Sequence, residues 1–371
     1  MKLTVSLIVL IFSLLPLSLN NSFANEKPKV QLAILLDTSN SMDGLIDQAK
    51  TQLWKIVNEL ALSKKNGQSI ELNVALYEYG NDGLKSSDGY VRMITNFTTD
   101  LDLISDELFK LKTFGGEEFC GTVIDSAIQV LNWSTNNEDL KLIFIAGNEE
   151  FTQGHVDYKK SCKEAISKGV IVNTIFCGDY NEGVQTFWKD GADLADGNYI
   201  NIDQNQQIAF IEAPQDEELN KLGQEINATY IGYGSYGEER VKMQEQQDAN
   251  ALGVNSEVLA QRNMTKGSGQ YINTDWDLVD AVNEGVVEIE KIKDEDLPEN
   301  MKNMTLEERE QYVEQQTQKR KGIQERIQLL SEERRKYIAQ KMLDENTNTL
   351  DAAILKTVRD QAVKQNFTFE Q

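Results

Sequence analysis

Residues 30–42 read Val-Gln-Leu-Ala-Ile-Leu-Leu-Asp-Thr-Ser-Asn-Ser-Met, an apolar run that ends abruptly at Asp37. A run this rich in Val, Ile and Leu is typical of a central strand that is covered on both faces of a parallel sheet. Ligands of such sheets bind just beyond the carboxyl ends of the strands, where Asp37 falls. Ser39 and Ser41 follow it, so one turn can direct three hard oxygens inward. Oxygen ligands of this kind favour a hard divalent cation such as Mg²⁺.

Asp37, Ser39 and Ser41 match the pattern Asp-x-Ser-x-Ser, and the segment resembles the von Willebrand factor type A (vWA) domain with its metal-ion-dependent adhesion site. In this family a threonine from a second loop completes the metal site. Thr122 matches that threonine and follows a glycine-containing loop that begins at Phe114. Helix capping is the competing interpretation of these residues, because Asp, Ser and Thr are good caps wherever a helix starts. We expect Thr122 to cap a helix in either case.

A third metal-site loop with an aspartate follows a buried strand in typical vWA domains. Here residues 140–146 form the expected strand, and Gly147 stands in the place of the aspartate, followed by Asn148 and Glu149. The resemblance therefore implies a degenerate site, to which Asn148 or Glu149 contributes an oxygen directly or through a water. We expect weakly bound Mg²⁺ or Mn²⁺, because one carboxylate is missing. The expected metal ligands are Asp37, Ser39, Ser41, Thr122 and Asn148.

Strand and helix patterns alternate as far as residue 202. We expect strands over residues 30–36, 70–77, 91–95, 140–146, 170–176 and 199–202. We expect helices over residues 44–62, 101–111, 123–133, 156–167 and 182–194. This alternation predicts an α/β fold with a doubly wound, mostly parallel sheet, in which the strand at 91–95 is an antiparallel edge strand. The resemblance to vWA domains covers roughly residues 29–213.

The pattern becomes largely α-helical from Asp216 onward. We expect an added strand over residues 228–233, a polar helix over 238–252 and an amphipathic helix over 276–292 that Asp275 caps. The whole chain then divides into a signal peptide at 1–24, a vWA domain at 28–215, a mixed helical extension at 216–300, and a long charged helix plus a terminal amphipathic helix at 301–371.

The long charged helix opens with a capping box formed by Thr305 and Glu308, and we expect it to run to about residue 343. Its apolar residues recur at spacings near three, four and seven, which is the pattern of a coiled coil. Gln316, Arg320 and Arg334 interrupt that seam. The last amphipathic helix can fold back either onto this helix or onto the body of the protein.

Residues 1–24 combine Lys2, an apolar run and a small-residue end at Ala24, which is the pattern of a secretory signal peptide cleaved near Ala24. We therefore expect a secreted or periplasmic protein with no membrane span in the mature chain. The formal net charge is −23, and cleavage would remove one lysine and no acid, leaving −24. This charge disfavours nucleic acid as a partner.

Three cysteines in a secreted chain predict one disulfide and one remaining thiol. Cys162 lies early in an expected helix that runs down from the top of the sheet, and Cys177 ends the next strand at that top. These two cysteines are therefore our first choice for the pair. Cys120, on the second metal loop, is a competing partner for either of them.

Enzyme chemistry has little support in this sequence. A single histidine, His155, cannot build a multi-histidine zinc site, and no Walker loop or Rossmann glycine fingerprint follows the first strand. We expect that the protein is not an enzyme. The resemblance implies a secreted vWA-type binding or adhesion module whose metal engages a protein ligand through an acidic residue of that ligand. The alternative is a structural or envelope scaffold that acts through its C-terminal helices, with self-association and no functional metal site.

Overall fold

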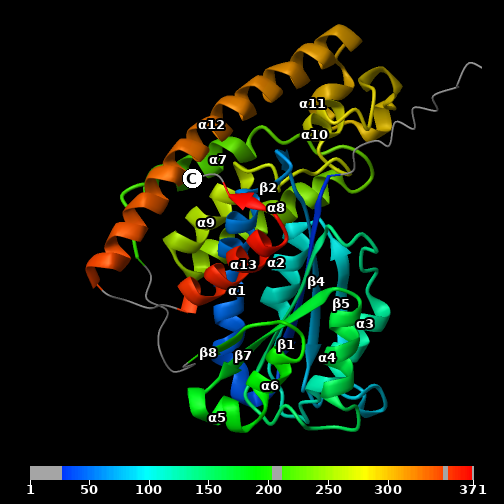
Figure 1. The fold of residues 1–371 in the computed structure, drawn as a ribbon. Helices are drawn as coiled ribbons and strands as arrows, with labels where there is room; N and C mark the ends of the chain where they lie inside the picture. Colours follow the sequence, from blue (N-terminus) through cyan, green and yellow to red (C-terminus); the bar gives the residue numbers. More distant parts are fainter. Residues whose placement is uncertain (1–26, 203–210, 346–349, 370–371) are drawn as a thin grey trace, which may run out of the picture.

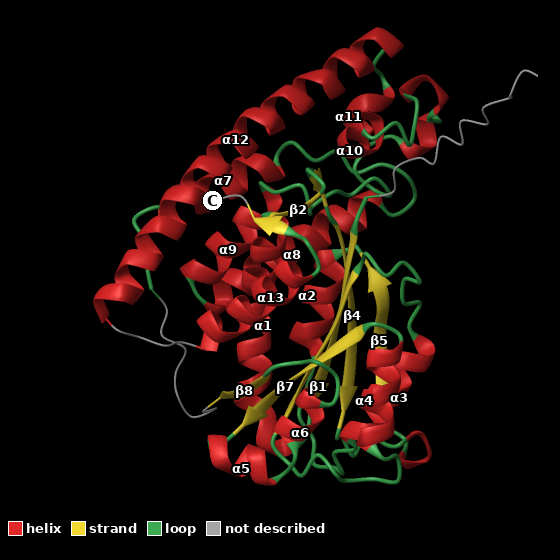
Figure 2. Ribbon diagram, viewed as in Figure 1, coloured by secondary structure: helices red, strands yellow, loops and turns green. Residues whose placement is uncertain are grey.

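The computed structural model describes residues 27–202, 211–345 and 350–369. Its main sheet has the strand order β5-β4-β1-β6-β7-β8 (Figure 1, Figure 2). The strands are β1 (Lys29–Asp37), β4 (Glu71–Tyr79), β5 (Val91–Thr98), β6 (Leu140–Gly147), β7 (Val170–Cys177) and β8 (Tyr199–Ile202). Neighbours are parallel except β4 and β5, so the predicted α/β fold with an antiparallel edge strand is confirmed.

Strand β1 lies between β4 and β6 and is buried on both faces. Its side chains enter two cores on opposite faces of the sheet, one containing Val30, Leu32 and Leu36 and the other Ala33 and Leu35. Because successive side chains of a strand point to opposite faces, a strand covered on both sides must be apolar at almost every position. Asp37 ends this strand and so lies at the carboxyl edge of the sheet.

Helices cover both faces of the sheet (Figure 1). The helices α3, α4 and α6 supply buried side chains to the core that contains Leu35. The helices α1 and α2 pack into the core that contains Leu32. The bounds of the helices in this half of the chain are α1 (Asp43–Ala61), α2 (Leu101–Lys110), α3 (Cys120–Val130), α4 (Tyr158–Ser167), α5 (Tyr180–Gln185) and α6 (Trp188–Asp193), with short 3₁₀ turns η1 (Asn40–Met42) and η2 (Ser86–Asp88).

The C-terminal region is largely helical, as expected. Its helices are α7 (Asp216–Asn227), α8 (Gly237–Val254), α9 (Ser256–Lys266), α10 (Leu278–Asn283), α11 (Glu299–Lys302), α12 (Leu306–Glu345) and α13 (Leu350–Lys364), with 3₁₀ turns η3 (Ile289–Lys291) and η4 (Asp294–Asp296). A small second sheet joins β2 (Ser63–Lys65), β3 (Gln68–Ser69) and β9 (Thr368–Phe369).

The C-terminal helices pack directly against the sheet domain. Helix α9 packs on α1, and α8 packs on α2. Helix α13 lies beside α1 and covers β8, and its Gln361 exchanges hydrogen bonds with Asn173 of β7 at 3.0 and 2.7 Å. The terminal amphipathic helix therefore folds back onto the body of the protein, which was one of the two expected placements.

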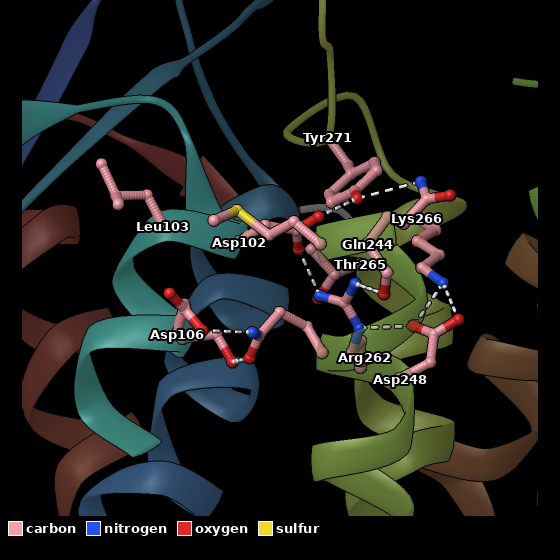
Figure 3. A network of polar contacts seen from close by, with 12 residues as sticks. Asp102, Leu103, Asp106, Gln244, Asp248, Arg262, Thr265, Lys266 and Tyr271 are labelled. Atoms are coloured by element: carbon pink, nitrogen blue, oxygen red, sulfur yellow. Dashed lines mark hydrogen bonds and ion pairs between the residues drawn. The ribbon is translucent and has the colours of Figure 1, made fainter. Parts of the chain in front are cut away.

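A buried polar network joins α9 to α2 and α8 (Figure 3). The Arg262 guanidinium donates to Asp102 Oδ1 at 2.5 Å and to Asp248 Oδ1 at 2.6 Å. Lys266 Nζ also donates to Asp248, and the Tyr271 hydroxyl donates to Asp102 Oδ2 at 2.5 Å. Burial raises the pKa of Asp248, but Lys266 and Arg262 outweigh it and hold that pKa at about 2. Asp248 therefore remains ionised against its cationic partners.

Two of the polar residues that interrupt the apolar seam of helix α12, Arg320 and Arg334, bind to other parts of the same chain. The Arg320 guanidinium donates to Asp277 Oδ2 at 2.6 Å and lies 3.9 Å from the centre of the Tyr230 ring. Arg334 Nε donates to Asp216 Oδ1 at 2.6 Å, and both arginines are buried. The predicted capping box is confirmed by mutual hydrogen bonds between Thr305 and Glu308. A coiled coil with a second chain stays a prediction.

Two predicted helix boundaries near the metal loops are wrong. The helix expected from residue 123 begins at Cys120, so Thr122 lies inside its first turn and does not cap it. The helix expected over 182–194 is two short helices, because Phe187 between them adopts a left-handed φ of +71°.

The predicted elements of the C-terminal region also need correction. The helix expected over 276–292 shortens to α10, which Asp277 caps instead of Asp275, and Gly285 at φ +69° stops its continuation. The strand expected over 228–233 is only an isolated bridge between Gly232 and Asp277. Helix α9 was not predicted, because its sequence is polar on nearly every side.

The predicted disulfide is wrong, since all three cysteines are buried free thiols. Cys177 packs into the core with α1, whereas Cys162 and Cys120 pack into the core on the other face of the sheet. The alternation of side chains along β7 sends Phe176 to one face and Cys177 to the other. The sequence predicts that both cysteines lie near the same edge of the sheet. Because they lie on opposite faces, the sheet separates Cys162 from Cys177.

Replacing Arg262 by alanine should destabilise the protein, because Asp102 would remain buried without its cation. Removing one partner of a buried ion pair costs about 3–5 kcal/mol, and we expect a loss of this size in the free energy of unfolding measured in urea. Lys242→Ala, which removes an exposed pair with Glu238, is the matched control and should change little. An Arg262→Ala protein as stable as the control would show that this network does not hold α9 in place.

Candidate metal centre

The Asp37 carboxylate is fully buried at the carboxyl end of β1. Its Oδ1 accepts a hydrogen bond from the Ser39 backbone N–H at 2.7 Å. Its Oδ2 has no hydrogen-bond partner within the described part of the chain. Leaving a buried carboxylate oxygen unpaired is costly, and such an atom in a folded protein calls for an explanation. The geometry leaves this oxygen available for a ligand.

Thr38 holds the turn that carries these groups. Its backbone N–H donates to the Tyr79 carbonyl at 2.9 Å, and its own carbonyl accepts from the Phe114 backbone N–H at 3.0 Å. The first loop is therefore tied both to the end of β4 and to the loop that precedes α3. These contacts position Asp37 and Ser39 next to the second loop.

Glu118 from the second loop is a further carboxylate beside Asp37, and it is only 7% exposed. The Ser39 side chain hydrogen-bonds the carboxylates of both Asp37 and Glu118. Gly80 lies against the same two residues: a Cβ at this position would be 2.8 Å from Asp37 Oδ1 and 2.9 Å from Glu118 Cγ. Its φ of +75° also favours glycine. The two carboxylates therefore meet over a position where only glycine leaves room.

These carboxylates are difficult to ionise without a cation. Burial raises the pKa of Asp37 to about 8; the charges of Glu118 and Glu149 add to the rise, while hydrogen bonds from Ser39 oppose it. Burial also raises the pKa of Glu118 to about 7, and the charge of Glu149 again adds to the rise. An opposite charge nearby favours the ionised form of a carboxyl group. A bound cation would thus lower both pKa values.

Gly147, in the place of the missing aspartate, does lie next to Asp37. A Cβ at this position would be 3.2 Å from Asp37 Oδ2, but also 2.6 Å from the Tyr79 hydroxyl and 3.0 Å from the Trp188 ring. Tyr79 and Trp188 are fully buried, and the Tyr79 hydroxyl donates to the Ala146 carbonyl at 3.0 Å. The space that a third-loop side chain would need is therefore occupied by aromatic groups.

The other three predicted ligands come from α3, from the residue after β6 and from the first loop. Thr122 lies in the first turn of α3 and, among the described residues, makes no side-chain hydrogen bond with Asp37 or Ser39. Asn148 directly follows β6 and is half-buried. The Ser41 side chain lies outside the described residues. The structure thus brings Asp37 and Ser39 together, while metal ligation by Thr122, Asn148 and Ser41 stays a prediction.

Sequence reasoning missed two residues of this centre, Glu118 and Tyr79. Glu118 lies in the glycine-containing loop that begins at Phe114, and its position in this loop could have indicated its role. Tyr79 pairs with Asp37 in the register between β4 and β1, which a single sequence does not show. Over the described ranges, no three His, Cys, Asp or Glu side chains form a group that could hold a metal ion.

The profile of the von Willebrand factor type A domain family matches residues 31–228. This match spans more than half of the chain, so the chain belongs to the vWA domain family. Domains of this family are generally binding or adhesion modules. The matched range includes Asp37, Thr122 and Gly147, and it extends into the C-terminal region through α7.

Solved structures of other proteins are similar to about half of this chain. BatB from Bacteroides thetaiotaomicron is 17% identical with a TM-score of 0.36, and the match covers 47% of this chain and 90% of that one. An aerotolerance-related membrane protein from Bacteroides fragilis is 16% identical, with a TM-score of 0.33 and coverage of 47% and 92%. Proximal thread matrix protein 1 from the mussel byssus, with a zinc-occupied metal site, is 12% identical, with a TM-score of 0.34 and coverage of 48% and 43%. No curated protein matches the chain.

The raised pKa values of Asp37 and Glu118 predict how stability depends on pH without metal. Folding then favours the protonated carboxyl groups, so their contribution is fully present below the ordinary pKa values of 3.8 and 4.5 and is lost progressively as the pH rises from there to about 7 to 8. In EDTA we expect Tm, measured by differential scanning fluorimetry, to fall across this range. Mg²⁺ should restore Tm more at the upper end of the range than below it, and Asp37→Asn should flatten the profile. An unchanged profile in Asp37→Asn would assign the pH dependence to other groups.

Restoring an aspartate at Gly147 should first destabilise the protein, because the new side chain meets the Tyr79 hydroxyl. Tyr79→Phe removes that hydroxyl, so the double variant Gly147→Asp with Tyr79→Phe should regain part of the lost Tm and bind Mg²⁺ more tightly than wild type. Thermal denaturation and calorimetric titration measure the two effects. Tyr79→Phe alone is the control for the loss of the hydrogen bond to Ala146. A double variant no more stable than Gly147→Asp would contradict the steric interpretation.

Proposed function

We propose that this chain is a secreted vWA-type binding module that engages a protein ligand through a degenerate metal-ion-dependent adhesion site. The observation that carries the proposal is the buried, unpaired Oδ2 of Asp37 beside the buried carboxylate of Glu118. Secretion rests on the signal-peptide pattern of residues 1–24, which lie outside the described residues. Across the described ranges, no helix has the length and apolar character needed to span a membrane.

The donor set fits a hard divalent cation such as Mg²⁺ or Mn²⁺. Such ions take carboxylate and hydroxyl oxygens, which are the groups that the first loop carries at Asp37, Ser39 and Ser41. The ion would be held by the residues predicted from the sequence, Asp37, Ser39, Ser41, Thr122 and Asn148. Glu118 would supply a second negative charge, and Glu149 is close enough for its charge to act on both carboxyl groups. When bound, the ion supplies a positive charge at the protein surface.

The ligand that suits this centre is a protein that offers an Asp or Glu side chain. Because Gly147 contributes no carboxylate, the bound cation keeps more positive character toward an incoming anion. The net charge of −23 opposes an acidic partner over longer distances, so the contact depends on the local field of the cation. Exposed apolar side chains such as Phe114 and Phe187, which are 57% and 42% exposed, supply contact surface from the loops at this end of the sheet.

A structural scaffold without a functional metal site is the second candidate function. The observation that favours it is the 40-residue helix α12, whose exposed side carries Leu329 at 64% exposure. Such a surface offers a contact for a second copy of the chain or for another envelope component. In this case the metal centre would play no part in binding.

Calorimetric titration with Mg²⁺ tests the metal centre directly. We expect weak binding, on the order of 1 mM, because a loop aspartate is missing. Asp37→Ala should abolish this binding, whereas Glu245→Ala, which removes an exposed acid of α8, should leave it unchanged. Equal heats from wild type and Asp37→Ala would place any bound metal elsewhere.

Ligand binding is tested by pull-down from cell-surface or envelope extracts. A partner should be retained in Mg²⁺, released by EDTA and absent from Asp37→Ala, because its carboxylate would complete the coordination of the cation. A partner retained equally in all three conditions would indicate that the C-terminal helices, and not the metal centre, bind it. That result would favour the scaffold over the metal-dependent module.

A further inference from the structure

A cavity of about 460 Å³ lies where α1, α9, α12 and α13 meet. Its volume is within the range of about 300–1,000 Å³ that is typical of small-molecule sites. Most of its wall is apolar and includes Leu62, Met264, Ile338, Met342 and Leu355. The residues of the metal centre do not line it, so the cavity is a separate feature of the molecule.

Two arginines line the same cavity as these apolar side chains, Arg335 of α12 and Arg359 of α13. Arg359 Nε donates to Glu59 Oε1 of α1 at 2.6 Å. The charge of Glu59 also acts on Arg335, and so does the positive charge of Arg359. Arg335 itself makes no hydrogen bond to any described residue. The carboxylate of Glu59 thus acts on two guanidinium groups, and Arg335 has no hydrogen-bonding partner among the residues that the structure describes.

The other charges around the cavity are balanced. Lys55 Nζ and Arg334 Nη2 lie 3.4 and 3.6 Å from Glu257 Oε1, and Arg334 Nε donates to Asp216. Lys356 at the rim pairs with Asp360. Arg335 and Arg359 face Glu59 and Glu332, and Glu332 also pairs with Lys336. One positive charge is therefore left in excess at these two arginines, within a chain whose net charge is −23.

Arg335 is in an unfavourable electrostatic position without an anion. Burial lowers its pKa, and the charge of Arg359 lowers it further, against the opposing effects of Glu332 and Glu59. Arginine remains charged in proteins, so the molecule bears this cost without losing the proton. A carboxylate ligand would relieve it, since guanidinium groups bind carboxylates through paired, charge-assisted hydrogen bonds.

We propose that this cavity binds the anion of a single-chain fatty acid, with the carboxylate at Arg335 and Arg359 and the hydrocarbon chain along Leu62, Met264 and Leu355. An apolar wall beside a cationic pair complements a molecule that has one apolar chain and one small anionic head. The cavity volume suits a single chain better than the two chains of a phospholipid. The proposal is independent of the metal centre and needs no divalent cation.

Calorimetric titration of the purified chain with dodecanoate, below the concentration at which it forms micelles, tests the proposal. We expect saturable binding of about one dodecanoate per chain, and no saturable binding of dodecyltrimethylammonium, which has the same chain length and the opposite charge. Arg335→Gln should weaken dodecanoate binding about tenfold or more. Lys321→Gln, which removes an exposed cation of α12 that does not line the cavity, is the matched control and should bind like wild type.

A second variant blocks the cavity without touching its charges. Ala339 lines the cavity but is itself exposed, so Ala339→Phe should occupy the space of the hydrocarbon chain and leave the core intact. We expect unchanged Tm and circular dichroism, with dodecanoate binding weakened about tenfold or more. No binding to wild type, equal binding of the cationic amphiphile, or full binding by folded Arg335→Gln and Ala339→Phe proteins would each overturn the proposal.

Discussion

The pairing of the Arg262 guanidinium with Asp102 is the interaction on which the placement of the C-terminal helices depends. Helix α9 buries polar side chains that include Gln261, Asn263 and Lys266, and such groups are stable inside a protein only when partners satisfy them. Asp102 comes from the sheet domain and Asp248 from α8, so the network joins the consecutive helices α8 and α9 to α2, which lies far from them in the sequence. Helix α9 also packs on α1, and it forms one wall of the cavity that α1, α12 and α13 bound.

Buried ion pairs also hold helix α12 in place. Arg320 and Arg334 are buried, and each is paired with aspartates of the region that precedes α12. A seam of apolar residues alone would let this long helix slide or pair with another copy, whereas a buried cation must meet its particular carboxylate. The two arginines therefore fix the register of α12 on its own chain. The helix is part of the body of the protein along this side.

In the candidate metal centre, the first loop follows from the sequence, but the residues that surround it do not. Asp37 and Ser39 lie as the strand and the turn predict, but the space beside Gly147 is filled by Tyr79 and Trp188. Negative charge comes instead from Glu118, which approaches Asp37 across the Cα of Gly80. The loss of one loop carboxylate is thus accompanied by a second buried carboxylate from a different loop. Both carboxyl groups are in an environment that favours either a proton or a cation.

The sequence by itself determined the sheet, because a strand buried on both faces must be continuously apolar, and it determined Asp37 at the end of that strand. The amphipathic helices and the capping box at Thr305 followed from equally local rules. Only the tertiary structure decided α9, the free cysteines, and the roles of Glu118 and Tyr79. One physical reason explains all of these features. Burial of a polar or charged side chain, and the face of the sheet that a cysteine occupies, depend on partners that are distant in sequence, and no local pattern encodes which partners will meet.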